Sequence, residues 1–233
     1  AEAAAGAARG AGVVANRYDP LSISSPRRAA RDWNRTVETV PAEVHGGALL
    51  VHGLTDSPYS MRAIAQVLAD GGFQTLSLRM PGHGTVPAAL THAVAEDWMA
   101  AVRMGARHLR RAMGPGRPIV LVGYSNGGAL VLRYALEAAA DSRLPAPARI
   151  VLISPMIGVS PMARLARAIS ALGPLPFFEK ARWLDVVPEY NPFKFNSFPA
   201  NAAQQSYRVS SSLQSELAAA AASGAIEKLP PIL

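Results

Sequence analysis

A serine stands among glycines in the stretch Gly123-Tyr124-Ser125-Asn126-Gly127, and a further glycine follows at position 128. An apolar run over residues 119–122 comes directly before this stretch, and a helical pattern over 128–140 comes directly after it. Small residues two before and two after a serine allow a turn tight enough to hold its hydroxyl above a sheet. The sequence therefore predicts Ser125 as a nucleophile at a strand–turn–helix junction, with a glycine-rich turn and an incidental serine as the alternative.

Two backbone N–H groups are predicted to bind the oxyanion that forms when a serine attacks a carbonyl. The first N–H groups of a helix lack partners and lie at the positive end of its dipole, which makes Asn126 one candidate donor. The loop after an earlier apolar run, His52-Gly53-Leu54-Thr55, offers the N–H of Leu54 as the second. Preorganised donors of this kind contribute about 3 kcal/mol each to the transition state. Tyr124, His52 and Gly53 are candidates for contacting the substrate.

The elements that must position these residues alternate along the chain from Gly46 onward. Short apolar runs bounded by turn residues are typical of buried parallel strands, and the longer amphipathic stretches between them are typical of crossover helices. The predicted strands are 48–51, 74–78, 119–122 and 149–153. The predicted helices are 60–69, 95–112 and 128–140. The sequence thus predicts an α/β fold with a mainly parallel central sheet.

The alternation stops after Ser154-Pro155, and residues 160–224 read as helical pieces rich in aromatic residues and interrupted by prolines. The prolines are Pro174, Pro176, Pro188, Pro192 and Pro199, and the aromatic residues are Phe177, Phe178, Tyr190, Phe193, Phe195 and Phe198. We interpret this region as a helical cap, or lid, that excludes water from a site, the alternative being aromatics that only pack onto the core. The predicted division is an N-terminal stem over 1–40, a core over 41–159, the cap over 160–224 and the start of a further strand over 225–233.

Three motifs together carry a family resemblance. They are His-Gly-Leu-Thr at 52–55, Arg-Met-Pro-Gly-His-Gly at 79–84 and Gly-Tyr-Ser-Asn-Gly-Gly at 123–128. In this order the chain resembles bacterial carboxylesterases and monoacylglycerol-lipase-like members of the α/β-hydrolase superfamily. The resemblance implies the α/β-hydrolase fold, Ser125 as nucleophile, and the N–H groups of Leu54 and Asn126 as oxyanion hole. It also implies that His52 fixes the oxyanion loop and that His83 lies in a turn bordering the site.

The catalytic acid and histidine that such a serine needs are not evident. In the family that the chain resembles, their order is serine, then acid, then histidine. All five histidines precede Ser125: His45, His52, His83, His92 and His108. Asp141, Asp185 and Glu189 follow it, but at the end of a helix or in the cap. We expect C-terminal strands carrying the acid and histidine to come from further sequence or a second chain. The alternative is a noncatalytic relative.

The composition of the chain narrows the classes of function that remain possible. Half of the 233 residues are apolar, so the chain can fold as a globule. The net charge is +7, but the arginines are spread without aromatic interleaving, which indicates a basic solvated surface rather than nucleic-acid binding. No metal site or cofactor is expected, because metal, phosphate-loop and dinucleotide fingerprints are absent from the sequence. The Ala/Gly-rich first residues indicate a flexible stem, and we expect a signal peptide or membrane anchor upstream of it. Extracytoplasmic and cytoplasmic locations both stay open.

These observations predict a serine carboxylic ester hydrolase that works through an acyl-enzyme on Ser125. The aromatic cap favours apolar acyl esters, and the resemblance adds aliphatic polyesters as polymeric substrates. Acyl transfer, peroxidase-type or amide-cleaving chemistry at the same serine stays open as an alternative. A ligand-binding protein of the same fold without catalysis is the alternative from another class.

Overall fold

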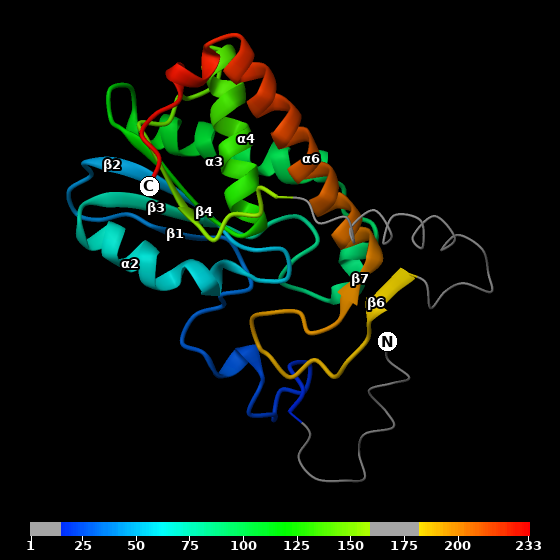
Figure 1. The fold of residues 1–233 in the computed structure, drawn as a ribbon. Coiled ribbons are helices and arrows are strands. Elements are labelled where there is room, and N and C mark those ends of the chain that lie inside the picture. The colour runs from blue at the N-terminus through cyan, green and yellow to red at the C-terminus, as the bar shows by residue number, and fades with distance from the viewer. Residues whose placement is uncertain (1–14, 159–181) are drawn as a thin grey trace.

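The computed structural model describes residues 15–158 and 182–233, and a sheet of five strands organises them (Figure 1). The strand order is β1-β3-β2-β4-β5. The strands are β1 (Val37–Thr39), β2 (Gly46–Val51), β3 (Phe73–Leu78), β4 (Ile119–Tyr124) and β5 (Arg149–Ile153). β2 to β5 are parallel, whereas β1 pairs antiparallel with β3 at the edge. The carboxyl ends of β2, β4 and β5 therefore lie at the same end of the sheet. This is the end at which α/β sheets place their sites.

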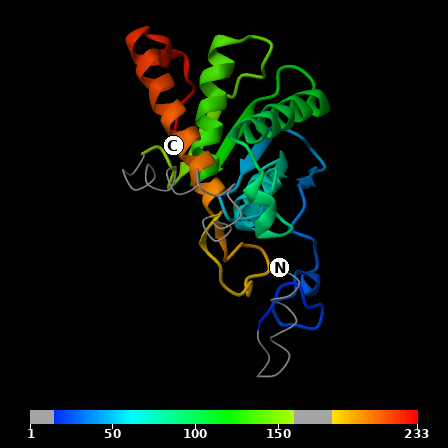
Figure 2. The same ribbon diagram turned by 90° about the vertical axis from the view of Figure 1, so that its right-hand side faces the viewer.

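Helices cover both faces of this sheet, as Figures 1 and 2 show. α2 (Arg62–Asp70) packs on one face, whereas α3 (Ala95–Met113) and α4 (Asn126–Ala140) pack on the other. The long helix α6 (Ala200–Ala222) lies outside α4 and also contacts α3. The described residues also form four short 3₁₀ turns: η1 (Pro26–Arg28), η2 (Pro58–Met61), η3 (Pro87–Thr91) and η5 (Ala225–Lys228).

The core lies between the sheet and the α3–α4 layer. Every residue of β2 is buried, and α3 presents an apolar stripe at helical spacing that includes the fully buried Trp98. A Cβ on Gly105 of α3 would stand 2.7 Å from Leu49 Cδ1, so glycine lets this helix lie close on β2. Trp98 also donates from Nε1 to the Pro81 carbonyl, 3.0 Å away. It is therefore a core residue that also fixes the loop after β3.

The strands and helices expected between residues 46 and 153 are confirmed, with ends that differ by a few residues. The predicted helix 60–69 begins as the 3₁₀ turn η2 before α2, and α4 begins at Asn126, two residues before its predicted start. Sequence reasoning did not predict β1. This strand has three residues and no apolar run, and its Glu38 accepts a hydrogen bond from the buried Gln74 of β3 at 2.6 Å.

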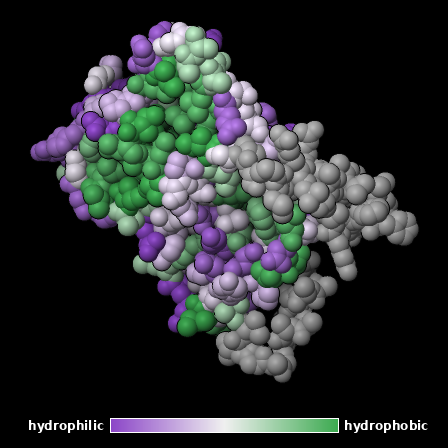
Figure 3. Space-filling model, viewed as in Figure 1, coloured by the Kyte–Doolittle hydropathy of each residue, from purple (hydrophilic) through white to green (hydrophobic). Residues whose placement is uncertain are grey.

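Residues 231–233 lie beside β5. The N–H groups of Ile150 and Leu152 donate to the carbonyls of Pro231 and Leu233, and Ile150 forms a parallel bridge with Ile232. The apolar run predicted to begin a further strand does pair with the sheet here. Figure 3 shows apolar residues gathered around this end of the chain. Within the described ranges, no helix has both the length and the hydropathy needed to span a membrane.

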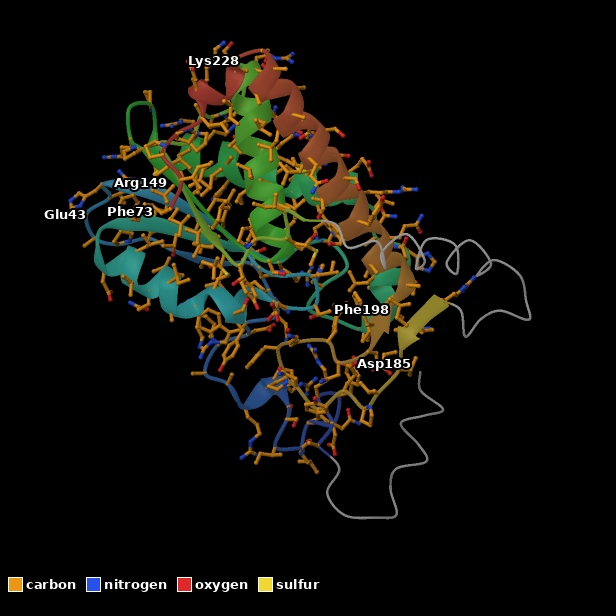
Figure 4. The ribbon with its side chains drawn as sticks, in the orientation of Figure 1. Glu43, Phe73, Arg149, Asp185, Phe198 and Lys228 are labelled. Carbon is orange, nitrogen blue, oxygen red and sulfur yellow. The ribbon has the colours of Figure 1, made fainter. Side chains whose placement is uncertain are left out.

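The described part of the predicted cap begins with β6 (Trp183–Asp185) and β7 (Phe198–Pro199), which form an antiparallel pair. Figure 4 labels Phe73 and Arg149, the first residues of β3 and β5, at one end of the sheet, far from Asp185 and Phe198. The β6–β7 segment therefore lies toward the carboxyl ends of the strands. α6 begins directly after Pro199. The predicted cap residues Phe177 and Phe178 lie outside the described residues.

Candidate active site

Ser125 occupies a strained turn between β4 and α4. Its backbone angles, φ 54° and ψ −118°, lie in a region that residues with a side chain rarely adopt. The Ser125 N–H donates to the Ile153 carbonyl at 3.0 Å, and its carbonyl accepts from the Met156 N–H at 2.9 Å. The end of β5 and the residues after it thus hold the turn on both sides. This is the strand–turn–helix geometry that the sequence predicted around this serine.

The glycines beside Ser125 make room for backbone rather than for a ligand. A Cβ on Gly123 would lie 2.6 Å from both the Gly127 carbonyl oxygen and Gly128 Cα. A Cβ on Gly127 would overlap the carbonyl oxygen of Val51 and lie 2.6 Å from that of His52. Real Cβ atoms do not approach backbone this closely, so α4 can begin against the end of β2 only with glycine at these positions. The two elements meet where the predicted oxyanion loop begins.

The two predicted oxyanion donors lie on elements that meet at this junction. Asn126 is the first residue of α4, so its N–H has no partner within the helix. Leu54 lies in the loop after β2, and its side chain is buried. The assignment of both N–H groups to an oxyanion hole stays a prediction.

His52 and His83 fix the oxyanion loop through backbone groups. His52 Nε2 accepts from the Met80 N–H at 3.2 Å, so the proton is on Nδ1, which donates to the Gly53 carbonyl at 2.8 Å. His83 Nε2 donates to the Leu54 carbonyl at 2.6 Å, and the two rings meet edge to face. Both side chains are buried. These contacts with backbone groups are those of residues that hold a loop in position.

Burial keeps the His52 imidazole neutral, which makes stability depend on pH. Burial, with a smaller effect of His83, lowers the pKa of His52 to about 3; burial also lowers the pKa of His83. Below about pH 6.5 the histidines of the unfolded chain bind protons, whereas the buried His52 of the folded protein stays unprotonated until the pH is much lower. We therefore expect the free energy of unfolding to be at its full value above that pH. It should fall on acidification toward pH 3, by about 1.4 kcal/mol per pH unit for His52 alone.

Urea unfolding between pH 4 and 7 measures this loss. The matched variant is His52→Gln, whose amide can donate and accept as the ring does but does not titrate. Its stability should fall less steeply on acidification. Equal slopes for the two proteins would contradict the assignment of the acid sensitivity to His52.

Three consecutive residues, Phe193-Lys194-Phe195, contact the predicted oxyanion loop and its neighbours. We call them the 193–195 strap. The Phe195 N–H donates to the Thr55 carbonyl at 2.8 Å. The Phe193 ring stacks on Tyr59 with centroids 4.2 Å apart, and the Phe195 ring stacks on His83. Sequence reasoning placed both phenylalanines in an apolar cap but missed these contacts. The strap helps to fix the position of Leu54.

Two serines of helix α6 hydrogen-bond residues next to the Ser125 turn. Ser206 Oγ donates to Asn126 Oδ1 at 2.7 Å, and Ser210 Oγ donates to the Met156 carbonyl at 2.8 Å. Both serines are buried, and they lie four residues apart on one face of the helix. Sequence reasoning missed them, because α6 carries several serines and nothing in the sequence shows which of them are buried.

A pocket of about 320 Å³ lies beside the end of β4, directly before Ser125. Three polar and three apolar residues line it: Asp56, Ser60, Tyr124, Met61, Ile64 and Ile153. Tyr124 directly precedes Ser125, and the Ile153 carbonyl bonds its N–H. Of the three residues predicted to contact substrate, Tyr124 thus lines the pocket. His52 and Gly53 are not among its lining residues, although a Cβ on Gly53 would stand 2.8 Å from Asp56 Oδ2.

None of the five histidines, all in the described part of the chain, hydrogen-bonds the Ser125 hydroxyl. The three acidic residues weighed as the catalytic acid, Asp141, Asp185 and Glu189, lie in the described part of the chain and make no hydrogen bond to a histidine there. Asp141 pairs with Arg143 at the end of α4, and Asp185 is exposed on β6. Glu189 accepts from the N–H groups of Asn196 and Ser197. Among residues 15–158 and 182–233, no three histidine or acidic side chains gather as metal ligands would.

This sheet order and this serine turn define the class of protein: the chain belongs to the alpha/beta hydrolase family, whose model matches residues 48–233. Among individual proteins, a thermostable monoacylglycerol lipase from Bacillus sp. strain H-257 is 37% identical over 89 residues. Those residues are 38% of this chain and 34% of the Bacillus lipase, so the match spans about a third of that relative's length.

Solved structures show the same fold at low sequence identity. One comes from work on LipS and LipT, two metagenome-derived lipolytic enzymes, with a TM-score of 0.63 and 23% identity over 79% of this chain and 71% of that one. Another is the monoacylglycerol lipase of Paleococcus ferrophilus, with a TM-score of 0.55 and 19% identity over 78% and 71%. A soluble variant of Saccharomyces cerevisiae monoglyceride lipase gives a TM-score of 0.55 and 13% identity over 75% and 64%. The chain is thus a lipase- or esterase-like α/β hydrolase in fold.

Proposed function

We propose that the protein is a serine carboxylic ester hydrolase that acts through an acyl-enzyme on Ser125. The single observation that carries the proposal is the backbone of Ser125, at φ 54° and ψ −118° between β4 and the first turn of α4. Strain of this kind persists only where the surroundings enforce it, and it is concentrated at functional sites. A serine held this way presents its hydroxyl beside the unpaired N–H groups of a helix start.

In the proposed reaction, Ser125 Oγ attacks the ester carbonyl and its proton passes to a general base. The N–H groups of Leu54 and Asn126 bind the oxyanion, the alcohol leaves with the proton, and water then releases the acid from the acyl-enzyme. The donor positions are supported by His83, which holds the Leu54 carbonyl, and by Ser206, which holds the Asn126 side chain. Besides Ser125 and the N–H groups of Leu54 and Asn126, the reaction requires a histidine as general base and an acid that orients it.

The proposed substrates are esters with apolar acyl groups, aliphatic polyesters included. Buried aromatic residues of the strap and the apolar half of the pocket support this class. We also propose that residues 160–224 act as a cap. In support, their described part lies toward the carboxyl ends of the strands and contacts both the oxyanion loop and α4.

A fluorophosphonate probe, which reacts with activated serines, tests the proposal. The protein expressed from its complete gene should gain the mass of one adduct, and tandem mass spectrometry should place it on Ser125. Ser154→Ala is the matched control, because Ser154 is an exposed serine that also has a positive φ, 43°, at the end of the neighbouring strand. That variant should be labelled as the natural protein is.

Labelling at another serine, or no labelling of a folded full-length protein, would contradict the hydrolase. The second outcome would favour a noncatalytic protein that binds acyl ligands. Supplying an alcohol acceptor and analysing the products would separate hydrolysis from acyl transfer.

A further inference from the structure

The residues that line the pocket next to Tyr124 are of two chemical kinds. Met61, Ile64 and Ile153, which we call the apolar wall, are hydrophobic, whereas Asp56, Ser60 and Tyr124 carry side-chain oxygen atoms. Pockets that bind small molecules combine an apolar lining with a few placed polar groups that set orientation. At about 320 Å³ this pocket is at the small end of the range for ligand sites. It therefore suits a short group with one polar side.

Asp56 is the polar group with unsatisfied bonding capacity. Its side chain is only 12% exposed, yet no N–H or O–H in the described ranges donates to its carboxylate. Lys194 of the strap stands 3.9 Å from Oδ1, too far for a hydrogen bond. Burial raises the pKa of Asp56, and Lys194 offsets part of that effect. Because carboxylates with little exposure are normally hydrogen-bonded, this mostly buried one is a candidate for receiving a donor from a ligand.

The surroundings select which donor fits. Lys194 already places a positive charge beside the carboxylate, so a second ammonium group would meet repulsion. A hydroxyl carries no charge, can donate to Asp56, and can accept or donate beside a neighbouring hydroxyl. Ser60 is such a neighbour: its Oγ donates to the Ser57 carbonyl at 3.1 Å, which leaves its lone pairs free to accept.

Building on the proposed hydrolase function, we propose that Asp56 is a specificity residue that accepts a hydrogen bond from a hydroxyl group on a short ester substrate. The apolar wall then packs against the carbon chain of the same group. The hydroxyl can belong to the alcohol part of the ester or to its acyl part, because the pocket chemistry is the same for both. Asp56, which follows the predicted oxyanion loop, and Tyr124, the residue before Ser125, both line this pocket, so it is the candidate site for either part.

Matched esters with and without the hydroxyl test this assignment. For the alcohol side the pair is 2,3-dihydroxypropyl butanoate and propyl butanoate; for the acyl side it is ethyl 3-hydroxybutanoate and ethyl butanoate. We expect the natural protein to prefer the hydroxylated member of one pair, which identifies the side. Asp56→Ala should reduce that preference in kcat/KM by about 10-fold or more, since a hydrogen bond to a charged group is lost. Asp56→Asn, which keeps the shape and one acceptor, should reduce it less.

Asp70→Ala is the control, because Asp70 is an exposed carboxylate at the end of α2 that pairs with Gln66. It should leave the preference unchanged. The assignment is overturned if the natural protein prefers neither hydroxylated ester, or if the Asp56 variants slow both members of a pair equally. Fluorophosphonate labelling of Ser125 is followed in every variant: absent labelling in the natural protein refutes the hydrolase itself. Labelling with unchanged selectivity refutes only the role of Asp56.

Discussion

Ser125→Gly is expected to make the protein more stable while abolishing its activity. Glycine adopts the backbone angles of Ser125 without strain, whereas a residue with a side chain incurs about 1–3 kcal/mol there. Part of this gain is lost because glycine makes the unfolded chain more flexible. We expect a net increase of about 1 kcal/mol in the free energy of unfolding. The kcat for ester hydrolysis should fall by about 10⁵-fold or more, as expected for loss of a nucleophile.

Ser125→Ala is the matched comparison. It removes the same hydroxyl but keeps the Cβ, so it should be as inactive as Ser125→Gly while its stability stays within about 0.5 kcal/mol of the natural protein. Urea unfolding and turnover of p-nitrophenyl butanoate measure the two quantities. If the glycine and alanine variants are equally stable, the backbone of Ser125 stores no strain. If Ser125→Ala retains activity, the nucleophile is another residue.

Gly127→Ala should damage the site through the backbone alone. The added Cβ would overlap the Val51 carbonyl oxygen and crowd that of His52. Since strand β2 lies buried in the middle of the sheet, α4 has to move instead, and it carries Ser125 and Asn126 with it. We expect a loss of about 3 kcal/mol in stability, at the upper end for overpacking. Displacing the reacting groups by about 1 Å should cost at least about 100-fold in kcat.

The control for this prediction is Gly71→Ala. Gly71 follows α2 with a negative φ of −81°, and a Cβ there would meet its nearest neighbours at ordinary contact distances of 3.4 and 3.5 Å. Its stability and turnover should stay close to those of the natural protein. Should Gly127→Ala also behave like the natural protein in urea unfolding and turnover, the contact between α4 and β2 is looser than the structure has it.

The sequence was sufficient for the central sheet because its signals are local. Each parallel strand is a short run with apolar residues and has glycine or proline close to one or both of its ends, and α3 repeats its buried residues at helical spacing. The serine turn is equally local, since Gly123 and Gly127 flank Ser125 within five residues. β1 was missed because its three residues are held by pairing with β3 rather than by an apolar pattern of their own.

The parts of the site that were missed depend on residues far apart in the chain. Phe195 meets Thr55, Lys194 approaches Asp56, and Ser206 bonds Asn126, all across 80 residues or more. Neither partner in these pairs has a distinctive sequence pattern, because each contact exists only after the segments pack. Asp56 was passed over for the same reason. Its carboxylate is unusual only in being mostly buried with no donor from the described residues, a property of the folded chain.

The pairing of β5 with residues 231–233 bears on how the protein is made. Ile150 and Ile232 are separated by 82 positions, so β5 leaves the ribosome well before the segment that covers its edge. At about 5–20 residues per second, the interval is roughly 4–16 s. Throughout it, an apolar strand edge can pair with another nascent chain. We therefore expect the yield of soluble protein to depend on translation speed and chaperone supply more than on the stability of the finished fold.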